Sequence, residues 1–465
     1  MAIQQADNDV ASSISRAIET ASSAAAYRTS MRRKHFDTIA VHGIYSMEEA
    51  LANQGSIIEP AHLSTSQHFE DSAIMEETLA YRLPGWVYSR ISNPTVHYLE
   101  ETLALLEGYG FDGETSACAT ASGMAAIWLA TSPFLRKVDK YGGQPANIVA
   151  SSRCYGGTFM LFQERYGVEQ GVEIRWVRDP LEMADWASKI DATTRFVYGE
   201  SPSNPGLAMF DIANVARLSH EHGVPLIVDS TVATPALMRP LCHGADIVVH
   251  SLTKCIGASG LAIAGVMIAR HGIASDVLPD DLCADFATTC KLQTFRDHGP
   301  ALSPLSALMI LSDLRTLRQR IDHFSRSAQV VAEFLAAHPR VESVIYPGLP
   351  DAVTHDVARK YMFLVDGDQE GKPTNRFSHL LSFTTRGGPA AAHAVLDTLR
   401  LIWHGTDLGR IKSVATIPAI STHQQQGESG RNLANIPDNL IRLSIGGEDP
   451  RDLIEDLDRA LNAAP

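Results

Sequence analysis

Between about residue 115 and residue 270, short apolar segments alternate with segments that have helical periodicity. Short apolar runs bounded by polar residues are typical of buried strands in a parallel sheet, because helices cover both faces of such a sheet. The alternation therefore predicts an α/β fold, with a mostly parallel sheet flanked by helices. We expect strands at 147–150, 172–177, 195–198, 225–228 and 246–249.

The last of these expected strands leads to the first candidate for chemistry. The run from Ile247 to Val249 is followed by Ser251, Thr253 and then Lys254. In parallel sheets, ligands bind just beyond the carboxyl ends of the strands. An amine that is partly desolvated there has a lowered pKa and can form a Schiff base. A surface lysine that merely ends a strand is the alternative.

The overall composition is that of an ordinary globular protein, and it excludes some classes of function. A chain of 465 residues can hold two or three domains. A formal charge of -14 argues against binding to nucleic acid. No segment approaches the roughly 18 uninterrupted apolar residues that cross a membrane. We expect no metal site, because the histidines of His220-Glu221-His222 point to different faces of a helix.

The six cysteines contain no CxxC pair and are expected to be free thiols. The chain also lacks GxGxxG after a strand and the GxSxG elbow, so neither a Rossmann dinucleotide site nor an α/β-hydrolase has its marker.

Four segments are expected along the chain. Residues 1–35 form an N-terminal extension, either a mobile arm or a helix lying on another subunit. Residues 36–98 form an arm, and the family resemblance described below implies that it reaches the neighbouring subunit. Residues 99–298 form the large α/β domain, and 299–465 form a smaller α+β domain. The expected elements are a helix from Asn93 to Gly108, one from Asp211 to His222, one long amphipathic helix through 311–335, strands at 377–383 and 441–444, and a helix at 451–461.

Four further features lie at loops beside the expected sheet. The turn 121–126, Ala-Ser-Gly-Met-Ala-Ala, opens a helix whose free amides favour a phosphate. Asp229 ends a strand, where its carboxylate would keep a ring nitrogen protonated. Tyr155 stands beside two glycines and is suited to stacking on a ring, and Asn204 lies between two prolines. Each has an ordinary structural explanation, but together with Lys254 they supply what pyridoxal 5'-phosphate (PLP) needs.

These residues resemble the Cys/Met-metabolism family of fold-type-I PLP-dependent enzymes, which includes O-acetylhomoserine sulfhydrylases, methionine and cystathionine γ-lyases and cystathionine γ-synthase. The resemblance extends from about Phe36 to the C-terminus, and the segments at 295–304 and 420–425 are most similar to the sulfhydrylase branch. The motifs that carry it are YSRISNPT (88–95), ASGMAA (121–126), ESPSNP (200–205), VDSTVATP (228–235), HSLTK (250–254) and RLSIGGED (442–449).

The resemblance implies a role for each matching residue. Lys254 would hold PLP as an imine and transfer protons, and Tyr155 would stack on the ring and protonate the departing group. Asp229 would pair with the ring nitrogen, and Asn204 with the ring hydroxyl. Arg442 would bind the substrate carboxylate. The phosphate would be bound by Ser122, Gly123, Met124, Ser251 and Thr253, and by Tyr88 and Arg90 of a neighbouring subunit.

The implied activity is γ-elimination or γ-replacement on an L-amino acid with a heteroatom at its γ-carbon. Such substrates include O-activated homoserine, methionine, cystathionine and canavanine-like compounds. A β-lyase acting on cystathionine or cysteine, and a PLP-binding protein that has lost catalysis, are the alternatives. The resemblance also implies a cytoplasmic enzyme that forms a catalytic dimer, and a tetramer made of two such dimers.

The chain departs from the family pattern at several positions near the expected site. Ala258-Ser259 replaces a common Gly-His, and Cys255 and Val232 replace aromatic residues. Asp407 stands near the position of an Asn or Ser, and Arg410 replaces an acidic residue. An acidic Asp407 at the substrate end of the site suggests the hypothesis that the substrate carries a cationic leaving group.

Overall fold

The computed structural model describes residues 2–135 and 146–465, and its centre is a seven-stranded sheet. The strand order is β1-β7-β6-β5-β4-β2-β3, in which β2 to β6 run parallel and β7 is antiparallel to both of its neighbours. The predicted α/β fold with a mostly parallel sheet is therefore confirmed. The strands are β1 (Thr115–Thr120), β2 (Asn147–Ser151), β3 (Glu173–Val177), β4 (Thr194–Glu200), β5 (Leu226–Asp229), β6 (Ile247–His250) and β7 (Gly265–Arg270).

Apolar side chains cover both faces of this sheet, which explains why its strands are continuous apolar runs. In β6, Val248 packs into the core on one face, and Ile247 and Val249 pack into the core on the other. The helices that follow the first arm helices and surround this sheet are α5 (Pro94–Glu107), α6 (Gly123–Thr131), α7 (Gly156–Met160), α8 (Met183–Ala187), α9 (Ile212–Glu221), α10 (Thr234–Leu237), α11 (Asp280–Ala284), α12 (Phe286–Cys290) and α13 (Arg296–His298).

The predicted helix starts follow from capping side chains. Asn93 Oδ1 accepts hydrogen bonds from the amides of Thr95 and Val96, with Pro94 in the first turn of α5. Asp211 accepts from the Asn214 amide at the start of α9, and Gly223 follows the end of that helix with φ +66°. Caps of this kind satisfy amides that have no partner within the helix.

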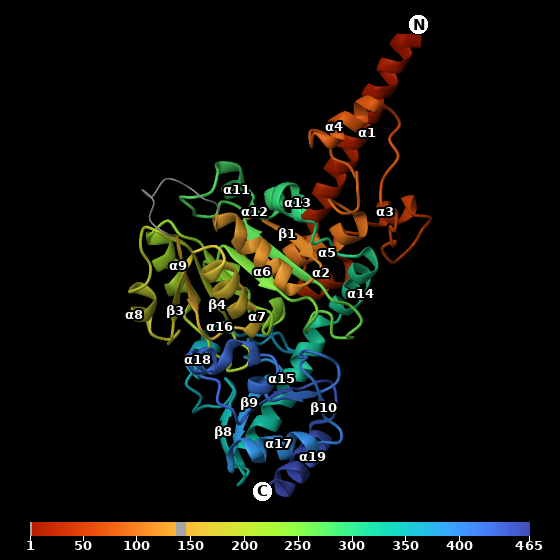
Figure 1. Ribbon diagram of the computed structural model, residues 1–465. Helices are drawn as coiled ribbons and strands as arrows, with labels where there is room; N and C mark the ends of the chain where they lie inside the picture. The colour runs from red at the N-terminus through yellow and green to blue at the C-terminus, as the bar shows by residue number, and fades with distance from the viewer. Residues whose placement is uncertain (1, 136–145) are drawn as a thin grey trace.

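The C-terminal part of the chain forms a second, five-stranded sheet in the order β10-β11-β12-β9-β8. Figure 1 shows this smaller domain below the large one, with the N-terminal helices projecting at the opposite end. Its strands are β8 (Val341–Ile345), β9 (Leu380–Thr385), β10 (Trp403–His404), β11 (Val414–Thr416) and β12 (Leu440–Ser444). Its helices are α14 (Pro304–Leu314), α15 (Leu317–Ala337), α16 (His355–Tyr361), α17 (Gly388–Thr398), α18 (Gly427–Leu433) and α19 (Pro450–Ala463).

Two sequence-based expectations for this part of the chain are wrong. The single long helix through 311–335 is two helices, α14 and α15, separated by Arg315 and Thr316. The break occurs where the Arg320 guanidinium donates to the Asp313 carbonyl at 2.7 Å and Arg315 forms an ion pair with Glu59. The strand expected from 377 begins only at Leu380, because Ser378 has φ +75° and cannot continue an extended strand.

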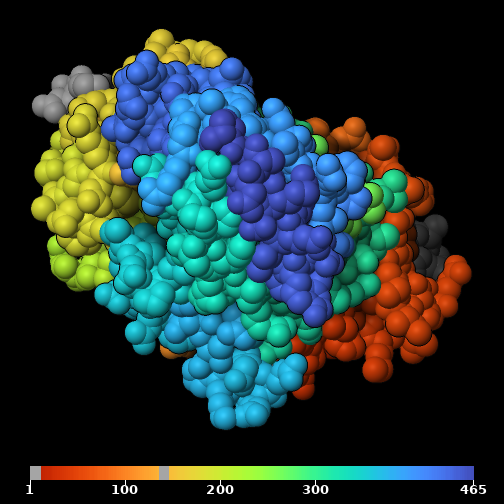
Figure 2. Space-filling model, turned by 90° about the horizontal axis from the view of Figure 1, so that it is seen from below, coloured from red at the N-terminus to blue at the C-terminus, as the bar shows by residue number. Residues whose placement is uncertain are grey.

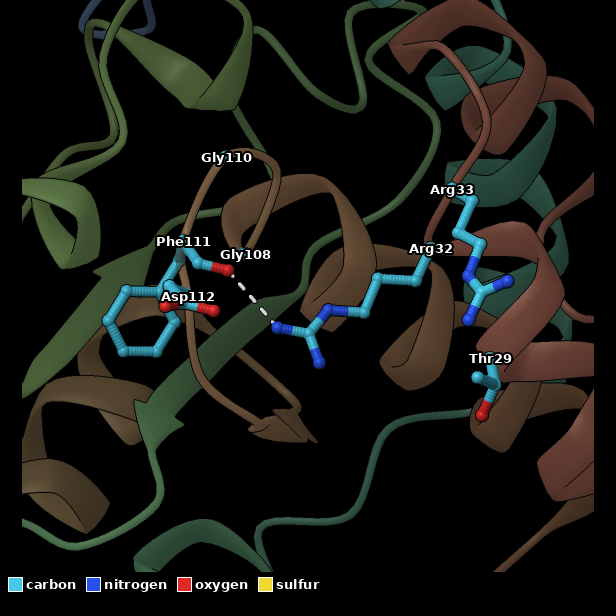
Figure 3. A pocket seen from close by; sticks show the side chains of 7 residues that line it. All are labelled: Thr29, Arg32, Arg33, Gly108, Gly110, Phe111 and Asp112. Atoms are coloured by element: carbon cyan, nitrogen blue, oxygen red, sulfur yellow. Dashed lines mark hydrogen bonds between the residues drawn. The ribbon is translucent and has the colours of Figure 1, made fainter.

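The N-terminal segment contains α1 (Ala2–Met31), α2 (Phe36–His42), α3 (Met47–Ala52) and α4 (Ser72–Leu79). Arginines near the end of α1 attach it to the large domain: Arg28 donates to the Thr115 carbonyl at 2.8 Å, and Arg32 to the Phe111 carbonyl at 3.1 Å. Figure 3 shows Arg32 reaching across the hollow between α1 and the 108–112 loop. In the view from below, the N-terminal segment lies at one side of the molecule (Figure 2). No described helix, α1 included, is long and apolar enough to cross a membrane.

Candidate active site

Three neighbouring parallel strands bring the candidate residues to one edge of the large sheet. In the ladder between β4 and β5, Glu200 is paired with Asp229, and in the next ladder Asp229 is paired with Val249. The chain leaves β6 at His250 and reaches Lys254 within a turn in which the Lys254 amide donates to the Ser251 carbonyl at 3.1 Å. Lys254 and Asp229 therefore lie beyond adjacent carboxyl ends, as the sequence predicted.

The Lys254 amine forms an ion pair with a residue from the small domain. Its Nζ lies 2.5 Å from Asp407 Oδ1, and the lysine side chain is one-quarter exposed. Burial lowers the pKa of the Lys254 amine below its ordinary value, and Arg442 and Arg410 lower this pKa further, whereas Asp407 opposes the shift. A nucleophilic amine needs a lowered pKa of this kind, because only the neutral form attacks a carbonyl.

Asp407 has cationic partners on both of its oxygens. Its Oδ1 is bound by Lys254, and Arg410 Nε donates to its Oδ2. Burial alone would raise the pKa of Asp407, but Lys254 and Arg410 outweigh this effect and hold the pKa below its usual range. A cationic substrate would therefore have to compete with Arg410 for this carboxylate, which bears directly on the hypothesis of a cationic leaving group.

The predicted phosphate-binding turn lies at the start of α6 and packs directly against the segment that leads to Lys254. Ser122 caps α6 by accepting from the Ala125 amide at 3.2 Å. A Cβ added to Gly123 would lie 2.7 Å from the Ser251 Cβ, so only glycine fits between the two segments. The Thr253 hydroxyl donates to the Ala264 carbonyl at 3.1 Å, so it would have to release this carbonyl before it could donate to a phosphate.

Asp229 is buried with little compensation for its charge. One carboxylate oxygen accepts from the Thr231 amide at 2.9 Å, and the other lies 3.4 Å from the Tyr198 hydroxyl. Burial raises the pKa of Asp229, and Thr231 and His250 act against that rise. A cation placed beside this carboxylate would stabilise its charged form, and this is the role predicted for a protonated ring nitrogen.

Glu200 is a site residue that the sequence analysis missed. Its two oxygens accept hydrogen bonds from the amide of Tyr155 at 2.6 Å and from the amide of Asn204 at 2.7 Å. Burial, followed by the charge of Asp229, raises the pKa of Glu200. The signal was present in the sequence, since Glu200 opens the 200–205 motif at a strand end just as Asp229 ends the next strand. Glu200 holds together the two loops that carry Tyr155 and Asn204.

Arg442 is fully buried in the small domain and points into this group of residues. One of its nitrogens donates to Asn204 Oδ1 at 2.9 Å, and another donates to the carbonyls of Thr406 and Asp407 at 2.9 and 2.7 Å. Within the described part of the chain its Nε has no hydrogen-bond partner. Burial lowers the pKa of Arg442 to about 10, which still leaves the guanidinium charged at neutral pH. A buried cation with a free donor is suited to an incoming carboxylate.

Tyr155 immediately precedes α7, and its ring meets that of His423 edge-on, with 6.2 Å between ring centroids. Burial raises the pKa of Tyr155, so the phenol keeps its proton at neutral pH. A Cβ on Gly156 would lie 2.3 Å from the Thr422 carbonyl oxygen, and one on Gly157 would lie 2.6 Å from the Tyr155 ring. These glycines therefore permit the close approach of the 422–423 segment and of the tyrosine ring itself.

Met124 borders this tyrosine loop, since a Cβ on Gly157 would lie 3.1 Å from its sulfur atom. Val232 packs in a small buried cluster with Leu207, Leu380 and Leu408, between the two domains. Cys255 is buried, and its carbonyl accepts from Arg320 at 2.8 Å. Ser259 is exposed, and its amide donates to Asp313 at 3.0 Å.

Tyr88 and Arg90 are not brought to the Lys254 group within one chain. Tyr88 is 43% exposed, the Arg90 guanidinium lies 5.5 Å from the Tyr88 ring centroid, and Arg90 also donates to the Arg296 carbonyl. This placement leaves the prediction that they serve a neighbouring subunit untested.

The remaining sequence candidates take no part in a site. All six cysteines are free thiols, as predicted. His220 Nε2 lies 2.7 Å from Asp246 Oδ2, and the described residues contain no group of three or more His, Cys, Asp or Glu placed to hold a metal ion.

Comparison with known proteins tests the predicted family. The profile of the family described as Cys/Met metabolism PLP-dependent enzyme matches residues 37–462. The L-methionine gamma-lyase of Pseudomonas putida is 34% identical, with 92% of this chain and 98% of that protein covered. The sulfhydrylase FUB7 of Gibberella moniliformis is 32% identical, with 93% of this chain and 98% of that protein covered.

A solved structure gives the same result for the fold. A putative O-acetylhomoserine (thiol)-lyase from Campylobacter jejuni, crystallised with a pyridoxyl group on a lysine, matches with a TM-score of 0.81 and 31% identity. The match covers 92% of this chain and all of that structure. The predicted fold type, PLP dependence and γ-elimination or γ-replacement class are confirmed at this level. The chain belongs to the family of Cys/Met-metabolism PLP-dependent enzymes.

Proposed function

We propose that this enzyme acts on an L-amino acid with a heteroatom leaving group at its γ-carbon, either eliminating that group or exchanging it for a thiol. The proposal is carried by one observation: Asp407 links Lys254 to Arg442. The Asp407 side chain binds the Lys254 amine, and the Asp407 carbonyl accepts a hydrogen bond from Arg442. A reactive amine and a carboxylate-binding guanidinium therefore lie within the reach of one amino-acid substrate.

The residues present fit PLP in their charge and hydrogen-bonding chemistry. Lys254 offers an amine with a lowered pKa, and Asp229 offers a buried carboxylate with an oxygen available to a ring nitrogen. Ser122, Gly123, Met124, Ser251 and Thr253 would hold the phosphate, with amides at the start of α6 supplying donors.

The remaining cofactor contacts would come from Tyr155 and Asn204. Asn204 Oδ1 accepts from Arg442, so the side-chain NH₂ of Asn204 remains available to donate to the ring hydroxyl. Tyr155 would stack on the ring, in the place where Glu200 fixes its backbone.

PLP, when bound, supplies an electron sink for the carbon next to the substrate amine. The chain's own residues would then control the protons. Lys254, once free, would take the proton from that carbon and later one from the β-carbon, since its lowered pKa makes the neutral amine that acts as a base more available. Tyr155, which keeps its proton, would donate it to the departing γ-substituent. Arg442 would orient the substrate through its carboxylate.

We also propose that the enzyme works in the cytoplasm as a tetramer made of two catalytic dimers, with Tyr88 and Arg90 reaching the neighbour's phosphate site. Exposed apolar side chains in the arm support a subunit interface there, because large apolar patches mark contact surfaces. They are Val41, Met47, Leu51, Ile57, Ile58, Leu63, Met75, Leu79, Tyr81, Trp86 and Tyr88. Six free thiols fit a reducing compartment.

Product identification tests the proposed reaction. The purified enzyme would be incubated with O-acetylhomoserine plus sulfide, with methionine, with cystathionine and with canavanine. Homocysteine from the first mixture would identify a sulfhydrylase, and 2-oxobutanoate with ammonia from the others would identify a γ-lyase. Pyruvate from cystathionine would show β-elimination and overturn the proposal, as would no product from any substrate.

A further inference from the structure

Asp407 lies at the junction of three cationic side chains. Its Oδ1 lies 2.5 Å from Lys254 Nζ, its Oδ2 accepts from Arg410, and its carbonyl oxygen accepts from Arg442 at 2.7 Å. Arg410 also donates to the carbonyl of Gly257 at 3.0 Å, in the loop that carries Lys254. The guanidinium of Arg410 therefore connects the Asp407 segment to the Lys254 loop.

Close backbone packing holds the segment that carries Asp407 and Arg410 against the loop that carries Lys254. A Cβ on Gly409 would lie 2.6 Å from the Cys255 amide nitrogen, and Gly409 has φ +72°. The Gly409 amide donates to Ser444 Oγ at 2.8 Å. The segment from 407 to 410 is thus packed directly onto Lys254 and Cys255, and only glycine permits this approach.

From these contacts we infer that Asp407, held in place by Arg410, positions the amine of Lys254 and sets the pH range in which Lys254 captures and keeps PLP. The inference rests on the proposed role of Lys254 as the residue that carries PLP. Asp407 is then a positioning residue that acts through Lys254, and it need not contact the substrate's leaving group.

Asp407 and Arg410 have opposite effects on the pKa of Lys254. Burial, Arg442 and Arg410 all lower the pKa of Lys254, and Asp407 is the group that opposes them. Asp407→Asn keeps the shape of the side chain but removes its charge, so Lys254 would lose its proton at lower pH. Arg410→Met removes a cation near Lys254 and also removes the competing partner of the Asp407 carboxylate. Lys254 would therefore keep its proton to higher pH.

The test measures PLP capture by the apoenzyme as a function of pH. Apoenzyme would be mixed with PLP, and the rate at which the visible absorbance band forms would be recorded from pH 6 to pH 10. An opposite charge in contact with an ionisable group typically shifts its pKa by about 1–3 units. We therefore expect the midpoint of the rate profile to fall by about one pH unit or more in Asp407→Asn. We expect it to rise in Arg410→Met and to stay near that of the wild type in Asp407→Glu.

Asp313→Asn is the matched control, because this carboxylate binds the Ser259 amide at 3.0 Å in the same region but has no contact with Lys254 among the described residues. Its midpoint should equal that of the wild type. Equal midpoints for wild type, Asp407→Asn and Arg410→Met would overturn the inference and leave these residues with a structural role only. If Asp407→Asn does not fold, the sign of the shift in Arg410→Met decides. Absence of the band in the wild type would instead contradict the proposed function.

Discussion

Gly265 offers a way to disturb the phosphate-binding turn without substituting any residue proposed to bind PLP. A Cβ at this position would lie 2.2 Å from the carbonyl oxygen of Ser122 and 2.7 Å from the amide nitrogen of Gly123. Ordinary non-bonded contacts need about 3.5 Å, so the turn must move by about 1 Å. Gly265 itself is held in the ladder opposite Thr120, so the displacement falls on the start of α6.

The expected effect of Gly265→Ala follows from this displacement. Overpacking of this kind costs about 1–3 kcal/mol. If this cost falls on the phosphate-binding form of the turn, the dissociation constant for PLP rises about fivefold to about 150-fold. The assay is an absorbance titration of the apoenzyme with PLP, together with a thermal melt.

Gly447→Ala is the matched control for this experiment. A Cβ at Gly447 would have its nearest neighbour at 3.6 Å, an ordinary contact, so PLP affinity should not change. Unchanged PLP affinity in Gly265→Ala, in a variant that folds, would refute the reasoning that this backbone contact fixes the phosphate-binding turn.

Three further predictions concern other parts of the site. Arg442→Lys should lower kcat/KM by about a hundredfold while the PLP absorbance remains, because an ammonium cannot replace the directed hydrogen bonds that a guanidinium would give the substrate carboxylate; an unchanged kcat/KM would contradict this role. Burial lowers the pKa of His423 to about 4, so its folded form resists protonation and the wild type should lose about 3 kcal/mol as pH falls from about 6.5 to 4. The free energy of unfolding by urea, measured at a series of pH values, should change less over this pH range in His423→Gln than in the wild type. The same pH dependence in both proteins would count against this role of His423. Mixed dimers of Tyr88→Phe and Lys254→Ala chains should regain activity that neither variant has alone, unless each site lies within one chain.

The sequence predicted the parallel strands because their apolar runs are continuous, and β2 to β6 lie within a few residues of the expected positions. It missed β1, whose residues Thr-Ser-Ala-Cys-Ala-Thr have no bulky apolar side chain, although every one of them is buried. It also missed β7, which follows a glycine-rich segment. The division between α14 and α15 was not predictable either, since no Pro or Gly marks it and the break depends on contacts made by Arg315 and Arg320.

The candidate site was predictable where a residue type has a specific chemical use. Lys254, Asp229 and Arg442 could be picked out for this reason, and the structure brings them to one region. Glu200 was missed because its task is to bind two backbone amides, and this depends on how distant loops fold. The pairing of Asp407 with both Lys254 and Arg410 depends on the packing of the small domain against the large one, and no local pattern records it.

The identity of the residue that carries PLP is the central claim, and chemical trapping tests it most directly. The purified enzyme would be reduced with borohydride, which fixes PLP to its lysine, and then digested and mapped by mass spectrometry. We expect a phosphopyridoxyl group on Lys254 and its loss in Lys254→Ala. A label on a different lysine, or no label on an enzyme shown to be active, would contradict it.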